Sequence, residues 1–260
     1  MNTTTQYTML DIAPTVSRIL QVRPPANSSG AVIEEIQSKL GVTDRVSLIV
    51  IDAFGVSTWQ RYKHLTSNFN ILADKNLVYI QSVLPAKTPV NFATMVTGAE
   101  PEVHNIKSRT DTLKVETIFH VLSEKKMKSA AIGWEASTVG ILLSPLADYK
   151  GIASSNTDEE VVKLATEIAK ENRPNFLILQ LLEVDSTGHK FGLEGEEIKE
   201  AILSADKHLG EILSTLLGER YAVLVLADHG AHQEGVKATH NGYSSQEDIF
   251  VPLTIASQDL

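Results

Sequence analysis

The chain has 260 residues, 43% of them hydrophobic, and a formal net charge of -9. This length and composition suit one soluble globular domain spanning residues 1–260. The acidic balance argues against nucleic acid polymers and anionic membranes as partners. The chain contains no cysteine, so disulfides and thiolate metal sites are excluded and any metal must be held by histidines and carboxylates. The N-terminus lacks the basic start and apolar core of a signal peptide, and we expect a cytoplasmic protein without a membrane span.

The N-terminal third predicts alternating helices and strands. Helices are expected over residues 11–20, over 31–40 with Gly41 as the stop, and over 59–72, because apolar side chains recur there at helical spacing. Strands are expected over 46–51 and 77–81, where short apolar runs are bounded by turn residues.

The rest of the chain continues this alternation. Helices are expected over 112–125, 157–171 and 194–217, and strands over 129–133, 175–182, 221–227 and 248–255. In the last strand Pro252 indicates an edge position or an irregular end, and His208 on the long helix is expected at the surface. The alternation predicts an α/β three-layer sandwich, a mostly parallel sheet with helices on both faces.

Ligand-type side chains follow three of the predicted strands. Asp52 follows the strand 46–51, Asp185 and His189 follow 175–182, and Asp228 with His229 follows 221–227; His240 stands in a later polar loop. Ligands in such sheets gather outside the carboxyl ends of the strands. Aspartate with histidine suits zinc or manganese better than calcium. His232, close to these residues, is expected to be exposed or to lie behind the ligands.

These six residues can form two sites with three protein ligands each, which leaves coordination positions open for water or substrate, as in catalytic sites. Two neighbouring cations can hold the attacking and leaving oxygens of a phosphoryl displacement. Thr88 follows a predicted strand and precedes a predicted helix. Its hydroxyl fits a nucleophile activated by a metal, and it equally fits an ordinary helix cap followed by Pro89.

Several motifs resemble the alkaline phosphatase superfamily, and most closely its nucleotide pyrophosphatase/phosphodiesterase branch. They are V-S-L-I-V-I-D, K-T-P-V-N-F-A-T-M-V-T-G, E-V-D-S-T-G-H-K-F-G, L-A-D-H-G and T-H-N-G-Y, in the family's order. The resemblance implies that Thr88 is the nucleophile and that Asn91 holds a phosphoryl oxygen. It implies one metal ion, zinc or else manganese, bound by Asp185, His189 and His240. It also implies a second metal ion, bound by Asp52, Asp228, His229 and Thr88.

The implied reaction on a small phosphate ester is in-line attack that forms a phospho-threonine, which water then hydrolyses. A phosphonoacetate-type phosphonate hydrolase, a phosphomutase and a non-catalytic relative remain alternatives. The segment from Thr8 to Pro25 is similar to the family's usual C-terminal tail. This similarity, within residues 1–30, predicts a circular permutation in which Met1 and Leu260 lie close in space. Chance similarity of a short capped helix is the alternative. The natural substrate and the oligomeric state stay open.

Overall fold

The computed structural model describes residues 7–240 and 245–260, and it is built around one large mixed sheet. The strands of this sheet, in spatial order, are β1 (Tyr7–Thr8), β3 (Val78–Gln81), β10 (Phe250–Ala256), β7 (Ala222–Leu226), β2 (Val46–Ile51), β6 (Phe176–Leu181), β4 (Ser129–Trp134) and β5 (Tyr149–Ala153). All neighbouring pairs are parallel except those of β10, which runs antiparallel to both β3 and β7.

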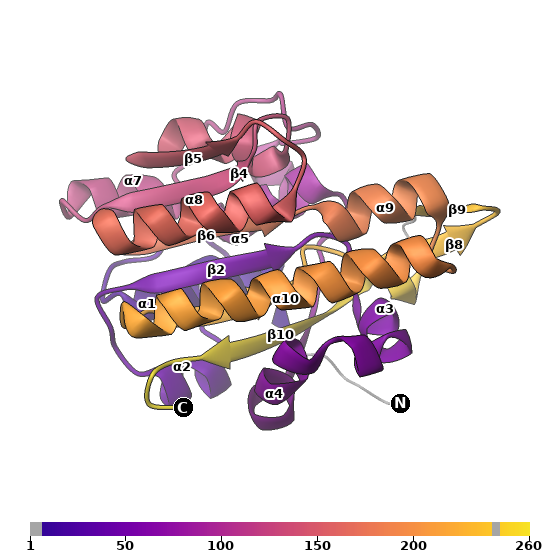
Figure 1. Ribbon diagram of the computed structural model, residues 1–260. Coiled ribbons are helices and arrows are strands. Elements are labelled where there is room, and N and C mark those ends of the chain that lie inside the picture. Colours follow the sequence, from indigo (N-terminus) through magenta and orange to yellow (C-terminus); the bar gives the residue numbers. More distant parts are fainter. Residues whose placement is uncertain (1–6, 241–244) are drawn as a thin grey trace.

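Helices cover both faces of the sheet, as the sequence predicts. In Figure 1, α8 and α10 lie in front of it, whereas α1, α5 and α7 lie behind it. The helices are α1 (Ile12–Ile19), α2 (Glu34–Leu40), α3 (Val56–Arg61), α4 (Ser67–Asn76), α5 (Thr88–Thr97), α6 (Pro101–His104), α7 (Ile118–Glu124), α8 (Asp158–Glu171), α9 (Glu183–Phe191), α10 (Glu196–Gly218) and α11 (Gln246–Ile249). None of them, within the part of the chain that the structure describes, is long and apolar enough to cross a bilayer.

The centre of the sheet is fully buried. Every residue of β2, β6 and β7 is buried, which is why these strands have nearly continuous apolar sequences instead of an alternating pattern. The three strands are adjacent and parallel, with Ile51 in register with Leu181 and Val50 with Leu226. Their carboxyl ends therefore open at the same edge of the sheet, and the residues that follow them are brought together there.

Several predicted helices have different limits in the structure. The helix expected over 59–72 is interrupted by a 3₁₀ turn at Lys63–Leu65, which separates α3 from α4. The helices expected from residues 31 and 112 begin only at Glu34 and Ile118. In the second case Thr117 and His120 form a reciprocal capping arrangement, and this fixes the start of the helix.

The edge position predicted from Pro252 was wrong, because β10 is paired on both sides. Pro252 is opposite Tyr79 of β3, and pairing with β7 begins only at Leu253. The missing N–H of proline is tolerated at a residue that is paired on one side only. The prediction that His208 is at the surface was also wrong: it is 6% exposed, because α10 packs against α4 and α8.

The N-terminal segment adds to the sheet beyond β3. β1 pairs with β3, so a single strand separates it from β10. Helix α1 forms as predicted and packs against α2 and α5. The Asp11 carboxylate accepts hydrogen bonds from the backbone N–H groups of Thr8 and Ala31. Met1 lies outside the described residues, so the proximity of the two ends and the circular permutation both stay predictions.

Candidate metal centre and active site

All six predicted ligands meet at the carboxyl edge of the central strands. Asp52 directly follows β2, and Asp228 with His229 follows β7. Asp185 and His189 are four residues apart on α9, the helix that follows β6, so they share one face of it. His240 follows β9 (Lys237–Thr239), which forms a hairpin with β8 (His232–Glu234). The predicted loop beyond it, from Asn241, lies outside the described residues.

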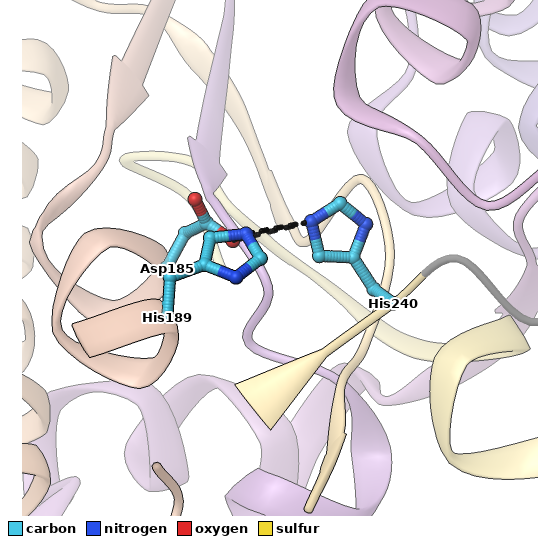
Figure 2. Close-up of side chains that lie close together, drawn as sticks. All are labelled: Asp185, His189 and His240. Carbon is cyan, nitrogen blue, oxygen red and sulfur yellow. Dashed lines mark hydrogen bonds and ion pairs between the residues drawn. The ribbon is translucent and has the colours of Figure 1, made fainter. Parts of the chain in front are cut away.

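One group, which we call the outer half-site, consists of Asp185, His189 and His240. Figure 2 shows these three side chains pointing toward one another from α9 and from the end of β9. Nε2 of His189 lies 3.0 Å from Nε2 of His240, and Oδ1 of Asp185 lies 3.3 Å from the first nitrogen and 3.6 Å from the second. The side chain of His189 is 44% exposed, so this half-site is open to solvent.

A second group, the inner half-site, consists of Asp52, Asp228 and His229, whose side chains are all 0% exposed. Nε2 of His229 lies 3.4 Å from Oδ1 of Asp52 and 3.3 Å from Oδ2 of Asp228. The rings of His229 and His240 stack with centroids 3.9 Å apart. The two half-sites are therefore in direct contact.

Asp185 lies between the two half-sites. Its carboxylate also comes within 4.8 Å of ligand atoms of Asp52 and His229, as well as of His189 and His240. The sequence-based division assigned Asp185 to one ion alone. The structure places its carboxylate within reach of residues of both half-sites.

Backbone carbonyls fix the tautomers of the three histidines. Nδ1 of His189 lies 3.1 Å from the carbonyl oxygen of Ala238, Nδ1 of His240 lies 2.9 Å from that of Ala86, and Nδ1 of His229 lies 2.9 Å from that of Gly230. A carbonyl oxygen can only accept, so each neutral ring carries its proton on Nδ1 and directs an Nε2 lone pair inward. Metal-binding histidines in proteins are held in this way.

This arrangement fits a cation better than it fits an empty pocket. The lone pairs of His189 and His240 face each other across 3.0 Å with no proton available between them. Oδ1 of Asp52 and Oδ2 of Asp228 are buried and have no hydrogen-bond partner among the described residues. Such buried acceptors are costly unless a donor or a cation compensates them. Nitrogen and carboxylate donors together suit zinc or manganese.

Burial also shifts the acid–base equilibria of these groups. Desolvation and the neighbouring carboxylates of Asp228 and Asp185 raise the pKa of Asp52 well above its usual range. Burial, with the charge of Asp185, raises the pKa of Asp228 to about 7. Burial lowers the pKa of His229 and of His240. A bound cation favours the deprotonated form of each ligand and so opposes the effect of burial on the two carboxyls.

Thr88 is the first residue of α5, and its hydroxyl points into the inner half-site. Lys87, not Thr88, occupies the N-cap position, and Pro89 is in the first turn. Oγ1 of Thr88 lies 3.0 Å from Nε2 of His229, and because that nitrogen carries no proton the hydroxyl is the donor. The structure thus separates the two sequence-based interpretations: Thr88 is not the cap of the helix, and its side chain contacts a candidate ligand.

Asn91 is fully buried one turn into α5 and holds the loop that carries Thr88. Its Oδ1 accepts from the N–H of Val83 at 2.8 Å, and its Nδ2 donates to the carbonyl oxygen of Lys87 at 3.2 Å. Its predicted contact with a phosphoryl oxygen stays a prediction. His232 is partly exposed and bonds to Asp248 at 2.7 Å, so it lies outside both half-sites.

Sequence reasoning missed Gln180, which contacts a ligand directly. Gln180 is on β6, and its Nε2 donates to Oδ2 of Asp52 at 2.6 Å. The signal that could have revealed it is the single amide in the otherwise apolar run F-L-I-L-Q-L-L, because a polar side chain in a strand covered on both faces requires a buried partner.

The architecture and the site together define an alkaline phosphatase-like α/β protein with a candidate binuclear metal centre. Residues 46–246 match the sequence model described as type I phosphodiesterase / nucleotide pyrophosphatase. The chain belongs to this family.

Curated relatives match over most of this chain but with only part of their own length. A venom phosphodiesterase of Macrovipera lebetinus is 32% identical over 216 residues, which is 72% of this chain and 25% of the relative. Ectonucleotide pyrophosphatase/phosphodiesterase family member 3 of Mus musculus is 26% identical over 217 residues, again 72% of this chain and 25% of the relative. The chain thus spans about a quarter of the length of these relatives.

Solved structures confirm the fold. Murine ectonucleotide pyrophosphatase/phosphodiesterase 5 superposes with a TM-score of 0.59 at 21% identity, covering 73% of this chain and 57% or 58% of the other. Phosphonoacetate hydrolase from Sinorhizobium meliloti 1021 gives a TM-score of 0.58 at 16% identity, covering 72% and 56%. TAB5 alkaline phosphatase gives 0.56 at 12% identity, covering 82% and 91%.

Proposed function

We propose that this protein is a metal-dependent phosphodiesterase that cleaves small phosphoric esters of the nucleotide type. In this proposal Thr88 is the nucleophile. Asp185, His189 and His240 hold one divalent ion, and Asp52, Asp228 and His229 hold a second one that also contacts Thr88. The family match and the relatives named as phosphodiesterases support the reaction class. Substrates, partners and activity of the whole protein are part of the proposal.

One observation carries the proposal most directly. A threonine hydroxyl lies 3.0 Å from the unprotonated nitrogen of His229. The same nitrogen lies 3.4 Å and 3.3 Å from two buried carboxylate oxygens that have no hydrogen-bond partner within the part of the chain that the structure describes. Burying these three hydrogen-bond acceptors together costs free energy unless a donor or a cation compensates them. A cation is the simplest species that compensates all of them at once. Divalent ions bound by these atoms would favour the Thr88 alkoxide and offset the negative charge of a phosphoryl group.

The chain's own residues then perform a two-step displacement. The Thr88 hydroxyl gives up its proton to solvent, Oγ1 attacks phosphorus, the bond from phosphorus to the leaving oxygen breaks, and the leaving alcohol takes a proton from solvent. Water next attacks the phospho-threonine, and the bond between phosphorus and Oγ1 breaks to restore the hydroxyl. Asn91 supports this chemistry by fixing the Val83–Lys87 loop, which leads into α5.

We propose zinc as the physiological ion, with manganese as the alternative. Three imidazole nitrogens among six ligands favour a borderline-soft metal over magnesium or calcium, which take oxygen ligands. Two ions with three protein ligands each keep open positions for substrate and water, as catalytic sites do.

Hydrolysis of bis-p-nitrophenyl phosphate by the zinc-loaded protein tests this function. Thr88→Ala should lower kcat/KM by about 1000-fold or more, because it removes the nucleophile. Thr88→Ser is the matched control, since it keeps a hydroxyl at the same position, and it should retain far more activity than the alanine variant. Equal turnover by wild type and Thr88→Ala contradicts the assigned nucleophile.

Two further substrates separate the alternatives. Turnover of phosphonoacetate in preference to the diester would favour a phosphonate hydrolase, and movement of phosphate between positions of one substrate without release would favour a mutase. A purified protein that binds neither zinc nor manganese would indicate a non-catalytic relative.

A further inference from the structure

Gln180 is a buried polar residue in the central strand β6, where all its neighbours along the strand are apolar. It is 1% exposed, and β6 lies between β2 and β4. Its side chain makes two hydrogen bonds. Nε2 donates to Oδ2 of Asp52 at 2.6 Å, and Oε1 accepts from the backbone N–H of Val139 at 3.1 Å. The amide therefore connects a candidate metal ligand to the turn that follows β4.

The contact with Val139 fixes which way the amide faces. A backbone N–H can only donate, so the atom of Gln180 next to Val139 must be the carbonyl oxygen. The NH₂ group is then directed at Asp52, whose Oδ2 must accept. This leaves Oδ1 of Asp52, which has no partner among the described residues, facing Nε2 of His229 at 3.4 Å. One oxygen of Asp52 is thus held by the protein, and the other is presented to the inner half-site.

We propose that Gln180 is a positioning residue for metal binding: it orients the Asp52 carboxylate so that one oxygen is reserved for the ion of the inner half-site. This inference rests on the proposed function, because it presupposes that Asp52 binds an ion. Outer contacts of this kind hold metal ligands in a defined orientation, and their loss typically costs about 10–100-fold in metal affinity.

A general packing role would have different consequences. Of the six candidate ligands, Asp52 of the inner half-site is the one that Gln180 hydrogen-bonds, and among the described residues no hydrogen bond joins it to Asp185, His189 or His240. A positioning role therefore predicts loss of one ion out of two. A packing role in the centre of the sheet predicts lower stability of the whole protein, with both ions affected alike.

The test is zinc titration of wild type and Gln180→Met in competition with a chromophoric chelator, together with thermal unfolding of the metal-free proteins. Methionine has nearly the same length as glutamine but no donor for Asp52. We expect the affinity for one zinc to fall about 10–100-fold, while the other zinc binds within about twofold of wild type. Ser47→Ala is the matched control, because Ser47 is buried on β2 and its hydroxyl has no partner among the described residues. It should bind both ions normally.

Gln180→Leu provides a second variant in case methionine prevents folding. Leucine is typical of buried parallel strands and has no hydrogen-bond donor for Asp52, so it should weaken the same single ion. Two zinc ions bound with wild-type affinity by a folded Gln180 variant would overturn the inference, as would parallel loss of both ions. A wild-type protein that binds no divalent ion would instead overturn the proposed function itself, and this inference with it.

Discussion

The two half-sites use the same residue types in opposite surroundings. The residues of the inner half-site directly follow β2 and β7, and their side chains are 0% exposed. The residues of the outer half-site lie on α9 and directly after the β8–β9 hairpin, and the side chain of His189 is 44% exposed. Charges that are removed from water depend on their partners far more than charges at the surface do. We therefore expect the inner half-site to need its ion for stability and chemistry, and the outer one to exchange its ion more readily.

The largest effect is expected from Asp228→Asn in the inner half-site. The substitution keeps the shape of the side chain but removes a buried charge that is 3.3 Å from Nε2 of His229. Loss of a direct ligand should exceed the about 10–100-fold effect of an outer contact, so diesterase kcat/KM should fall more than about 100-fold. The metal-free variant should unfold at a higher temperature than metal-free wild type. Activity close to wild type would remove Asp228 from the site.

The second prediction concerns the pH dependence of the metal-free protein. The folded-state pKa of Asp228 is raised to about 7 from an ordinary value of 3.8, so the folded state holds this proton more tightly than the unfolded chain. The contribution of Asp228 to the unfolding free energy is therefore fully present below about pH 4 and is lost as the pH rises toward 7. The lowered pKa values of His229 and His240 act in the opposite direction, so the effect of Asp228 is isolated by comparison with Asp228→Asn. Chelated wild type should lose about 2 kcal/mol more unfolding free energy between pH 5 and pH 8 than the chelated variant.

Added zinc should reverse this loss, because the ion binds the deprotonated ligands of the folded state. Urea unfolding at the two pH values, with and without the metal, measures both effects. A chelated wild type that loses no more stability over this range than chelated Asp228→Asn would contradict the burial argument.

The Asp158→Asn variant tests a buried carboxyl group that lies outside both half-sites, for comparison with Asp228. Oδ1 of Asp158 accepts from the N–H of Leu182 at 2.7 Å, and burial beside Glu183 raises its pKa to about 7. Asparagine keeps an acceptor for the N–H of Leu182 and removes the charge. Between pH 5 and pH 8, metal-free wild type should lose about 2 kcal/mol more unfolding free energy than the metal-free variant, because the variant lacks this titrating group. Zinc affinity should change little, and a large drop would show that Asp158 also sets the position of α9.

The smallest effect is expected from His189→Ala in the outer half-site. His189 is a partly exposed ligand on α9, and water can occupy the space that the ring leaves. We expect about a tenfold loss of kcat/KM at low zinc, largely restored by excess zinc, because affinity and not the geometry at Thr88 is impaired. A loss as large as that of Asp228→Asn, without rescue, would erase the distinction between the two half-sites.

Much of the fold and the ligand set follows from local patterns. Apolar runs followed by Asp52, Asp185 and Asp228 predict buried parallel strands with candidate ligands near their carboxyl ends, and the structure has these strands and brings the three side chains together there. What could not be predicted depends on contacts between distant segments. The antiparallel insertion of β10 between β3 and β7 is decided by pairing, and the burial of His208 by the helices beside α10.

The same limit applies within the site. The position of Asp185 between the half-sites depends on how α9 is oriented, and the bond from Gln180 to Asp52 joins residues 128 positions apart. The N-cap role allowed for Thr88 was excluded only by the backbone geometry at Lys87.

The carbonyl oxygens of Ala86, Ala238 and Gly230, which determine where each ring carries its hydrogen, belong to the main chain. At Gly230 the residue type matters as well, because a side chain there would meet the backbone carbonyl of Glu247. A shift of the main chain by about an ångström at any of the three positions would lengthen the hydrogen bond beyond its normal range and free the ring to turn. The path of the main chain thus decides which nitrogen of each ring is available to a cation.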